Sequence, residues 1–303
     1  LKMGSYGLIR FSLPLFPEAS LQFATFLSVL AVVGIIYGAM AAMVQTDIKK
    51  LVAYSSVSHL GFIVLGIFSF TEEAMTGAVI QMVNHGIATG GLFLLVGMIY
   101  DRRHTREIKD FQGIAKQMPR FAFLFLITVM ASVGLPGLNG FVGEFMVLIG
   151  SYQSEIIAGV FPILAATGVV IAAVYLLWMF RRVMYGQLDK EENRQLVDLN
   201  LREIAVMVPL VALMFVMGLY AKPFLKQISP SAKRLVNEVL IQGQQAEAPV
   251  PEQEEEEASA LKAEAPHSVE MAHGIAAWHE DAEVSTPTPV TDSRLAVFRP
   301  VSP

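Results

Sequence analysis

The chain has 303 residues, of which 54% are apolar and 16% charged, with a mean hydropathy of +0.52 and no cysteine. Soluble domains carry about 25% charged residues, so this composition excludes an ordinary soluble domain and favours a chain that lies mostly in lipid. Because cysteine is absent, a disulfide framework, a thiolate zinc site and a cysteine-ligated iron–sulfur cluster within this chain are excluded as well.

Membrane-spanning helices are predicted along most of the chain, because each requires about 20 mostly apolar residues and several segments meet that length. The sequence therefore predicts an all-α membrane protein, a polytopic bundle of about six complete spans with a partial span before them. The partial segment is 1–11, and the complete segments are 21–44, 50–70, 75–100, 121–150, 158–180 and 204–221. The chain begins inside an apolar segment without the features of a signal peptide, so we expect further residues of the protein to precede Leu1.

Charge is unevenly distributed between the two parts of the chain. Residues 1–228 contain 17 basic and 14 acidic side chains, a net +3, whereas residues 229–303 contain 5 and 13, a net −8. The sequence thus predicts a transmembrane domain over 1–228 and an acidic, disordered C-terminal tail over 229–303. Residues 231–242 have the pattern of a short interfacial helix. Neither part carries the basic stripe that is typical of nucleic-acid binding.

The loops predict an orientation, because basic residues concentrate on the cytoplasmic side of membrane proteins. Thirteen basic residues lie in the segment QTDIKK at 45–50 and in the loops 101–120 and 181–203, whereas only three lie in the loops of the opposite side before the tail. We therefore expect the first group of loops to face the cytoplasm. The C-terminal tail is then expected on the outer face.

Four ionisable residues lie inside the predicted spans: Lys2, His59, His85 and Glu144. A charge in hydrocarbon is costly, so each is a candidate functional residue. Counted at 1.5 Å per residue from the outer loops, all four lie roughly 10 to 18 Å deep, which places them in one layer near the middle of the membrane. Polar residues three or four positions away share the helix face of each histidine and favour a chain of water molecules along which a histidine can pass protons. These neighbours are Ser55, Ser56, Gln81 and Thr89.

Glu144 is the only charged residue between Arg120 and Glu155, and it follows the segment VGLPGLNGFVG. Pro136 and four glycines lie in that segment, and proline removes a backbone hydrogen bond from a helix interior. A straight helix over 121–150 would be about 45 Å long, which is more than the hydrocarbon core requires. The sequence therefore predicts a broken helix beside a buried charge, a feature of ion pathways in transporters.

Structural alternatives exist for several of these residues. Either histidine alone could simply hydrogen-bond a neighbouring helix. Lys2 lies near the start of the chain and is ambiguous by itself. Lys49 and Lys50 lie at a cytoplasmic helix end, where lysine side chains commonly extend toward the headgroups.

Three ordered motifs carry a resemblance to a known family: AMVQTDIKKLVAYSSVSHLGF, QMVNHGIATGGLFLLVGMIYDRRHTREIKDFQGIAKQMP and ASVGLPGLNGFVGEFMVLIGSY. With the opening segment, they resemble the proton-translocating, antiporter-like subunits of respiratory complex I, the NADH-quinone oxidoreductase. The resemblance covers about 1–225. The opening segment, the sequence HTREI and Glu144, in place of a lysine, resemble the M branch of that family.

The resemblance implies a fold of 14 transmembrane helices in two inverted repeats of five. Residues 1–11 would then end the eighth helix, and the six complete segments would be helices 9 to 14. We therefore expect helices 1 to 7, with a glutamate and a lysine of their own, to precede Leu1 in the protein.

The resemblance also implies roles for five residues. Lys2 matches the central lysine that passes protons between half-channels, and His59 and His85 match the histidines that continue the polar axis. Glu144 matches the terminal ionisable group near the outward exit. Lys49 matches the lysine of the QTDIKK motif and is expected on the proton-transfer path.

The function implied by the resemblance is proton translocation by a membrane-arm subunit of NADH:quinone oxidoreductase. Electron transfer would take place on partner subunits, which would hold NADH, FMN, the iron–sulfur clusters and quinone, so this chain would bind no cofactor and no metal. Its partners would be other membrane-arm subunits, especially the antiporter-like chains L and N, within the inner membrane of a bacterium.

Three alternatives remain open for this sequence. A subunit of a multi-subunit sodium/proton antiporter or of a membrane-bound hydrogenase shares the QTDIKK and LPG motifs. A haem-binding electron-transfer protein would use His59 and His85, which lie at matching depth. A plain structural scaffold is the third alternative, and Glu144 argues against it.

Overall fold

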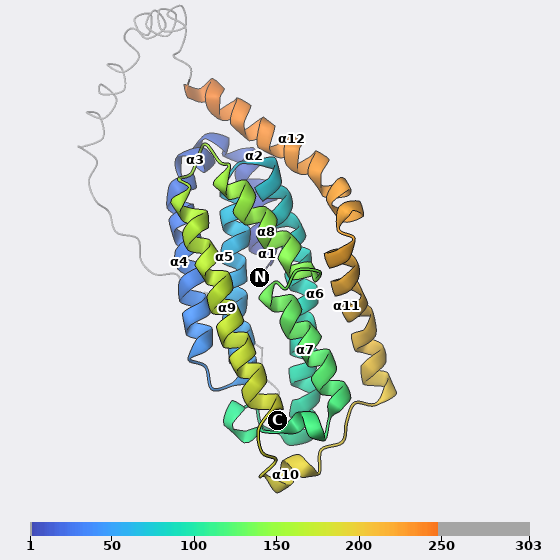
Figure 1. Ribbon diagram of the computed structural model, residues 1–303. Coiled ribbons are helices and arrows are strands. Elements are labelled where there is room, and N and C mark those ends of the chain that lie inside the picture. The colour runs from blue at the N-terminus through green and yellow to red at the C-terminus, as the bar shows by residue number, and fades with distance from the viewer. Residues whose placement is uncertain (1, 248–303) are drawn as a thin grey trace, which may run out of the picture. The chain divides into compact units, whose positions relative to one another are not determined.

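The computed structural model describes residues 2–247, and all its regular elements there are helices (Figure 1). Five of them are long and apolar enough to cross a membrane. These are α4 (Ala24–Met43), α5 (Ile48–Phe68), α6 (Glu72–Arg103), α9 (Val160–Met184) and α11 (Leu201–Leu219). They confirm five of the six predicted complete spans, with α6 longer than predicted by three residues at each end.

The partial first segment is also helical. It comprises α1 (Lys2–Gly7), a π-helical turn (Leu8–Ser12) and α2 (Leu13–Leu15), after which α3 (Pro17–Gln22) leads into α4. Helix α1 lies against α5, which is the most thoroughly buried of the spans. The start of α1 therefore lies next to the interior of the helix bundle (Figure 1).

The sixth predicted span is broken, as the sequence indicated. Helix α7 (Pro119–Val133) and helix α8 (Asn139–Tyr152) are separated by a short turn. Gly134 and Gly137 have φ angles of +83° and +95°, a left-handed conformation that side chains disfavour. Pro136 lies between them and cannot continue the hydrogen bonding of α7. The break therefore follows directly from the residues LPG and the glycine before them.

Helices α6 and α8 pack with their backbones unusually close. A Cβ added at Gly150 would lie 2.3 Å from the backbone nitrogen of Ala74, and one added at Gly77 would lie 2.8 Å from that of Val147. Small residues permit such close approach between membrane helices. This packing brings the α8 face that carries Glu144 directly against α6.

The region after residue 221 differs from the prediction. Helix α12 (Lys222–Glu247) is longer than the expected interfacial helix at 231–242, and the expected domain boundary at 228/229 falls inside it. Ala232, Val236 and Val239 are buried against the bundle, because apolar residues recur at helical spacing after the charge boundary. The predicted disorder of the later tail lies outside the described residues.

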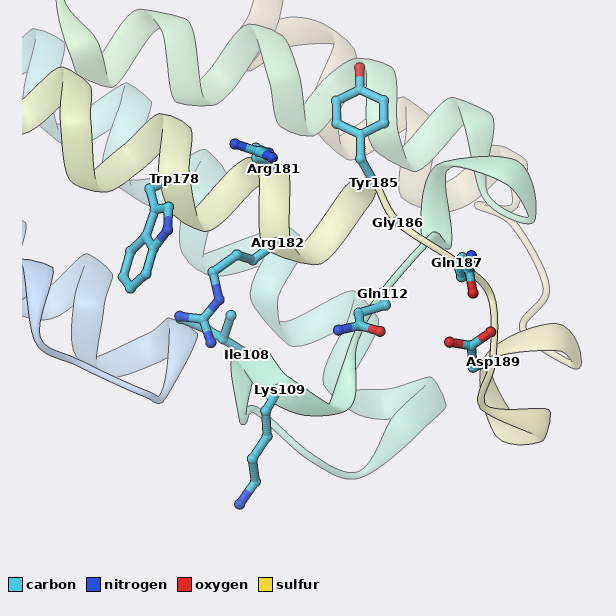
Figure 2. Close-up of a pocket in the computed structure, with 10 residues that line it drawn as sticks. All are labelled: Ile108, Lys109, Gln112, Trp178, Arg181, Arg182, Tyr185, Gly186, Gln187 and Asp189. Carbon is cyan, nitrogen blue, oxygen red and sulfur yellow. The ribbon is translucent and has the colours of Figure 1, made fainter.

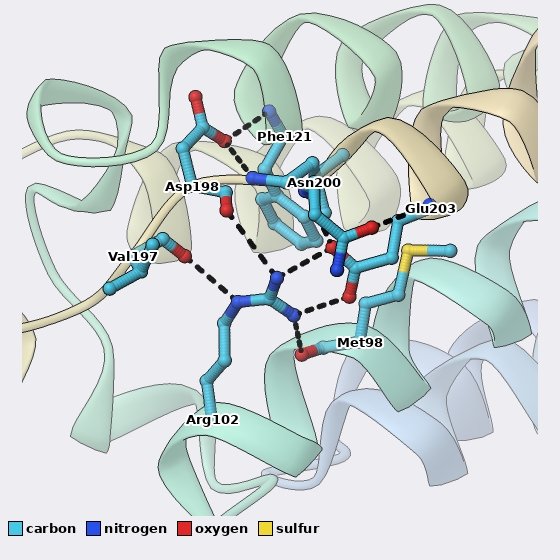
Figure 3. Close-up of polar contacts among 8 residues, drawn as sticks. Met98, Arg102, Phe121, Val197, Asp198, Asn200 and Glu203 are labelled. Atoms are coloured by element: carbon cyan, nitrogen blue, oxygen red, sulfur yellow. Dashed lines mark hydrogen bonds and ion pairs between the residues drawn. The ribbon is translucent and has the colours of Figure 1, made fainter.

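One end of the bundle is tied by a network around Arg102, the penultimate residue of α6 (Figure 3). Its guanidinium donates to both carboxylate oxygens of Glu203, at 2.7 and 2.6 Å. Glu203 belongs to a capping box with Asn200 at the start of α11. Asp198 accepts the backbone N–H of Phe121, 3.1 Å away, at the start of α7. These contacts connect the end of α6 with the starts of α7 and α11. The two parallel hydrogen bonds between Arg102 and Glu203 hold the guanidinium group in a defined orientation.

Replacing Gly150 by alanine tests the close packing of α6 and α8. The added methyl group meets the backbone of α6, so we expect a destabilisation of about 1–3 kcal/mol and a lower thermal unfolding midpoint in detergent. Gly90→Ala is the matched control, because no heavy atom lies within 4 Å of the Cβ position there. Equal midpoints for the two variants would contradict the close approach of the two helices.

Candidate functional site

Glu144 is the residue around which the buried polar groups gather. Only 4% of its surface is exposed. Its Oε1 atom accepts hydrogen bonds from Nδ1 of His59 on α5, at 2.7 Å, and from Nε2 of Gln81 on α6, at 3.0 Å. Two donors from two different helices thus satisfy a carboxyl group that would otherwise be costly to bury.

The roles of the two ring nitrogens of His59 follow from this contact. When Glu144 is ionised its carboxylate accepts, and Nδ1 of His59 carries the donated proton. Nε2 of His59 is buried and has no hydrogen-bond partner within residues 2–247. The ring can therefore receive a proton on one side and donate one on the other.

His85 continues the line of contacts from His59. The centroids of the two imidazole rings are 5.3 Å apart, with the planes at 64° in an edge-on arrangement. Nδ1 of His85 is hydrogen-bonded to Nζ of Lys2 on α1, and Nε2 lies 3.3 Å from the hydroxyl of Thr89. Lys2, His85, His59 and Glu144 therefore form one succession of ionisable side chains drawn from four helices, and all but Lys2 are buried.

A small cavity of about 10 Å³ lies among these side chains, and His59, Gln81, Asn84, His85 and Glu144 contribute to its lining. That volume is at the lower limit for one water molecule. The side-chain oxygens of Gln81 and Asn84 are buried without a protein partner in the described part of the chain. The cavity is therefore polar enough to hold a water beside the two histidines, and it is far too small for a haem.

Asn84 and Asn139 hold the broken helix in place beside this cavity. The amide nitrogen of Asn84 donates to the backbone carbonyl of Asn139, at 2.7 Å, and the amide nitrogen of Asn139 donates to the carbonyl of Asn84, at 3.2 Å. The exchange ties the first turn of α8 to the middle of α6 and satisfies a carbonyl within each helix. The sequence reasoning missed this pair, although an asparagine next to His85 inside an apolar segment was a usable signal.

Lys49 does not join this group. Its side chain is exposed in the first turn of α5, and its backbone N–H donates to the carboxylate of Asp47, 2.7 Å away. Ten residues, or about 15 Å of helix, separate it from His59. A part for Lys49 in proton transfer stays a prediction.

The ionisable groups of this site are an amine, two imidazoles and a carboxyl group, which act as acids and bases. Within residues 2–247, no three histidine, aspartate or glutamate side chains are grouped so that they could hold a metal ion. What the arrangement can do is hold, accept and donate protons along a line between α1 and α8.

A bundle of apolar helices around a buried line of ionisable side chains, with a helix break beside it, defines the class of polytopic membrane transport proteins. The chain belongs to the NADH:quinone oxidoreductase/Mrp antiporter transmembrane family, whose sequence pattern matches residues 1–172. The matched residues include the broken helix and the polar side chains around it.

Individual relatives agree with the family. The chain is 45% identical to NADH-quinone oxidoreductase subunit M of Rhodobacter capsulatus over 236 residues, which are 78% of this chain and 46% of that protein. It is 41% identical to subunit M of Mycobacterium tuberculosis, over 78% of this chain and 42% of that protein. The chain thus spans about half the length of the curated relatives it matches.

Chains of two solved membrane complexes have a similar fold. A chain of respiratory complex I from Thermus thermophilus with bound NADH superposes with a TM-score of 0.74 at 35% identity, covering 78% of this chain and 50% of that one. A chain of the Mrp complex from a Dietzia species superposes with a TM-score of 0.70 at 19% identity, covering 80% and 53%, and so shares the fold.

Gly134→Ala tests the contact between the helix break and the acidic side chain. A Cβ there would lie 3.1 Å from Oε2 of Glu144, whereas at Gly137 it would meet only a leucine methyl at 3.6 Å. Both positions have positive φ, so both alanine variants lose about 1–2 kcal/mol to backbone strain. We expect only Gly134→Ala to shift the carboxyl band of Glu144 in infrared spectra, assigned with a Glu144→Gln sample. A shift of the same size in Gly137→Ala would contradict the contact.

Proposed function

We propose that this chain is a membrane-arm subunit of an NADH:quinone oxidoreductase and that it translocates protons. The observation that carries the proposal is the succession of contacts from Lys2 through His85 and His59 to Glu144 beside a broken helix, with the last three side chains buried. Ionisable groups inside membrane helices generally mark ion pathways, because their burial is costly without a function.

The geometry supports a direction of relay along these residues. The ammonium group of Lys2 donates to Nδ1 of His85, and the small cavity beside the two rings is lined by both histidines. Nε2 of His59 has no hydrogen-bond partner within residues 2–247, so it can accept a proton from a water in that cavity. A proton that arrives at Nε2 of His59 allows Nδ1 to release its own proton to Oε1 of Glu144. Glu144 then holds the proton until a change in a neighbouring charge favours its release.

Electron transfer would belong to partner subunits. NADH, FMN, the iron–sulfur clusters and quinone would bind there, and this chain would respond to the charge changes that quinone reduction produces. Its partners would include other membrane-arm subunits, especially the antiporter-like chains L and N. The distribution of basic loops supports an orientation with the acidic tail on the outer face of the inner membrane.

A sodium/proton antiporter subunit, or a subunit of a membrane-bound hydrogenase, is the alternative within the same family. Two observations favour complex I over the antiporter. The identity to complex I subunits is 35–45%, whereas the chain of the Mrp complex is 19% identical. Glu144 also faces N–H donors from His59 and Gln81, whereas a sodium ion requires oxygen ligands around it.

Glu144→Gln tests the proposal within the assembled membrane complex. The amide cannot accept and release a proton, so we expect the initial rate of proton translocation to fall about 100-fold, the lower end of what a positioned proton-transfer group contributes. The measurement is proton uptake into vesicles driven by NADH oxidation. Glu155→Gln is the matched control, because Glu155 is exposed in the loop after α8.

Two outcomes would contradict the proposal. One is an unchanged ratio of protons translocated per electron in Glu144→Gln. The other is a translocation rate that depends on the sodium concentration in the unsubstituted complex, which would favour the antiporter.

A further inference from the structure

A second polar hollow lies at the last turns of α9 (Figure 2), at the opposite end of the spans from α12 (Figure 1). It has a volume of about 770 Å³ and lies between α9, the segment 108–112 and the segment 185–189. Figure 2 shows the Arg182 guanidinium on the side of α9 that carries Trp178, with Lys109 on the adjoining loop. None of these residues belongs to the buried line of acids and bases that runs from Lys2 to Glu144.

The lining of this hollow is positively charged. Lys109, Arg181 and Arg182 contribute three basic groups, and Asp189 contributes one acidic group. Within the described residues, none of the three basic side chains makes an ion pair. The hollow therefore presents a net positive charge that this part of the chain does not neutralise.

Lys190, which lies near the hollow, differs from these three basic residues because it makes an ion pair. Lys190 lies 3.0 Å from the carboxylate of Asp110, which also accepts the hydroxyl of Thr105 at 2.8 Å. The Lys190 ammonium and the Thr105 hydroxyl hold the pKa of the Asp110 carboxyl below its ordinary value. The charge of Lys190 is thus already matched, whereas the charges that line the hollow are available to a ligand.

The hollow lies at the depth of lipid headgroups. Arg182 belongs to the last turn of α9, a helix that is long and apolar enough to span the membrane. Its guanidinium lies 4.5 Å from the centre of the Trp178 ring, which is 44% exposed. Tryptophan is enriched at membrane–water interfaces, and the cation–π contact holds the arginine there.

The walls are fixed by backbone contacts between the two loops. The N–H of Gly113 donates to the carbonyl of Tyr185, 3.2 Å away. Gly113 has a φ of +67°, and a Cβ there would lie 3.0 Å from the carbonyl oxygen of Gly186. The loops therefore meet in a defined geometry and keep Lys109 next to the end of α9.

We propose that this hollow binds the phosphate group of an anionic phospholipid. Arg182 and Lys109 contact the phosphate from two walls, and the exposed face of Trp178 packs against the glycerol and upper acyl carbons. Arginine suits a phosphate because its planar group donates two parallel hydrogen bonds. Basic pockets between membrane helices are a general form of lipid recognition. The proposal goes beyond proton translocation and does not depend on it.

The test measures lipid retained by the assembled membrane complex in nanodiscs of phosphatidylcholine with increasing phosphatidylglycerol, read by native mass spectrometry. We expect Arg182→Gln and Lys109→Gln each to weaken retention of one phosphatidylglycerol about fivefold, and the double variant about 30-fold. The matched controls are Arg202→Gln and Lys116→Gln, because both side chains are exposed and neither lines the hollow. Retention of phosphatidylcholine should be the same in all variants.

Three results would overturn the proposal. Retention equal to that of the controls would show that the basic residues only anchor the helix at the interface. Loss of a partner subunit with unchanged lipid retention would assign the hollow to a protein contact. Displacement of the lipid by millimolar inorganic phosphate would assign it to a soluble phosphate compound. If Arg182→Gln fails to assemble, Lys109→Gln on the loop carries the same test.

Discussion

The contact between Glu144 and His59 is the interaction on which the interior of this bundle depends. A carboxyl group inside a membrane helix is costly unless donors surround it. The donors come from α5 and α6, so α8 must lie close to both helices. Glycines at the interface of α6 and α8 permit that distance, and the turn before α8 lets the short helix take its own direction.

The same constraint explains the amide pair beside the break. The amide groups of Asn84 and Asn139 each donate to the other residue's backbone carbonyl, which adds two hydrogen bonds between α6 and α8 next to the break. Asn84 also lines the small polar cavity to which His59 contributes, and its amide oxygen is buried without a protein partner in the described residues. Asn84 thus both joins α6 to α8 and contributes to the polar cavity beside the histidines.

Hydropathy and helix length were sufficient to predict the spans, because burial in lipid depends on composition over about 20 residues. The break at Pro136 and its glycines was predictable for a local reason, the loss of a backbone hydrogen bond. The approach of Lys2, His59, His85 and Glu144 was inferred from depth alone, and the structure brings these four together. Depth gives one coordinate only, so it could not reveal that Gln81 shares the carboxylate of Glu144.

Other features could not be read from the sequence by the same reasoning. The boundary at 228/229 rested on net charge, whereas α12 continues across it and is held by apolar residues that follow it. The pairing of Asn84 with Asn139 depends on the crossing of α6 and α8, which no local pattern specifies. The hollow beside Arg182 depends likewise on two loops that are distant in sequence and meet through backbone contacts.

The most direct test of the central claim is a double-mutant cycle on proton translocation with His59→Gln and Glu144→Gln in the assembled complex. If the two side chains are consecutive links of one path, either substitution interrupts it and the double variant is no slower than the slower single variant. Reductions that multiply in the double variant would show that the two residues act independently, and would contradict a single path through their contact.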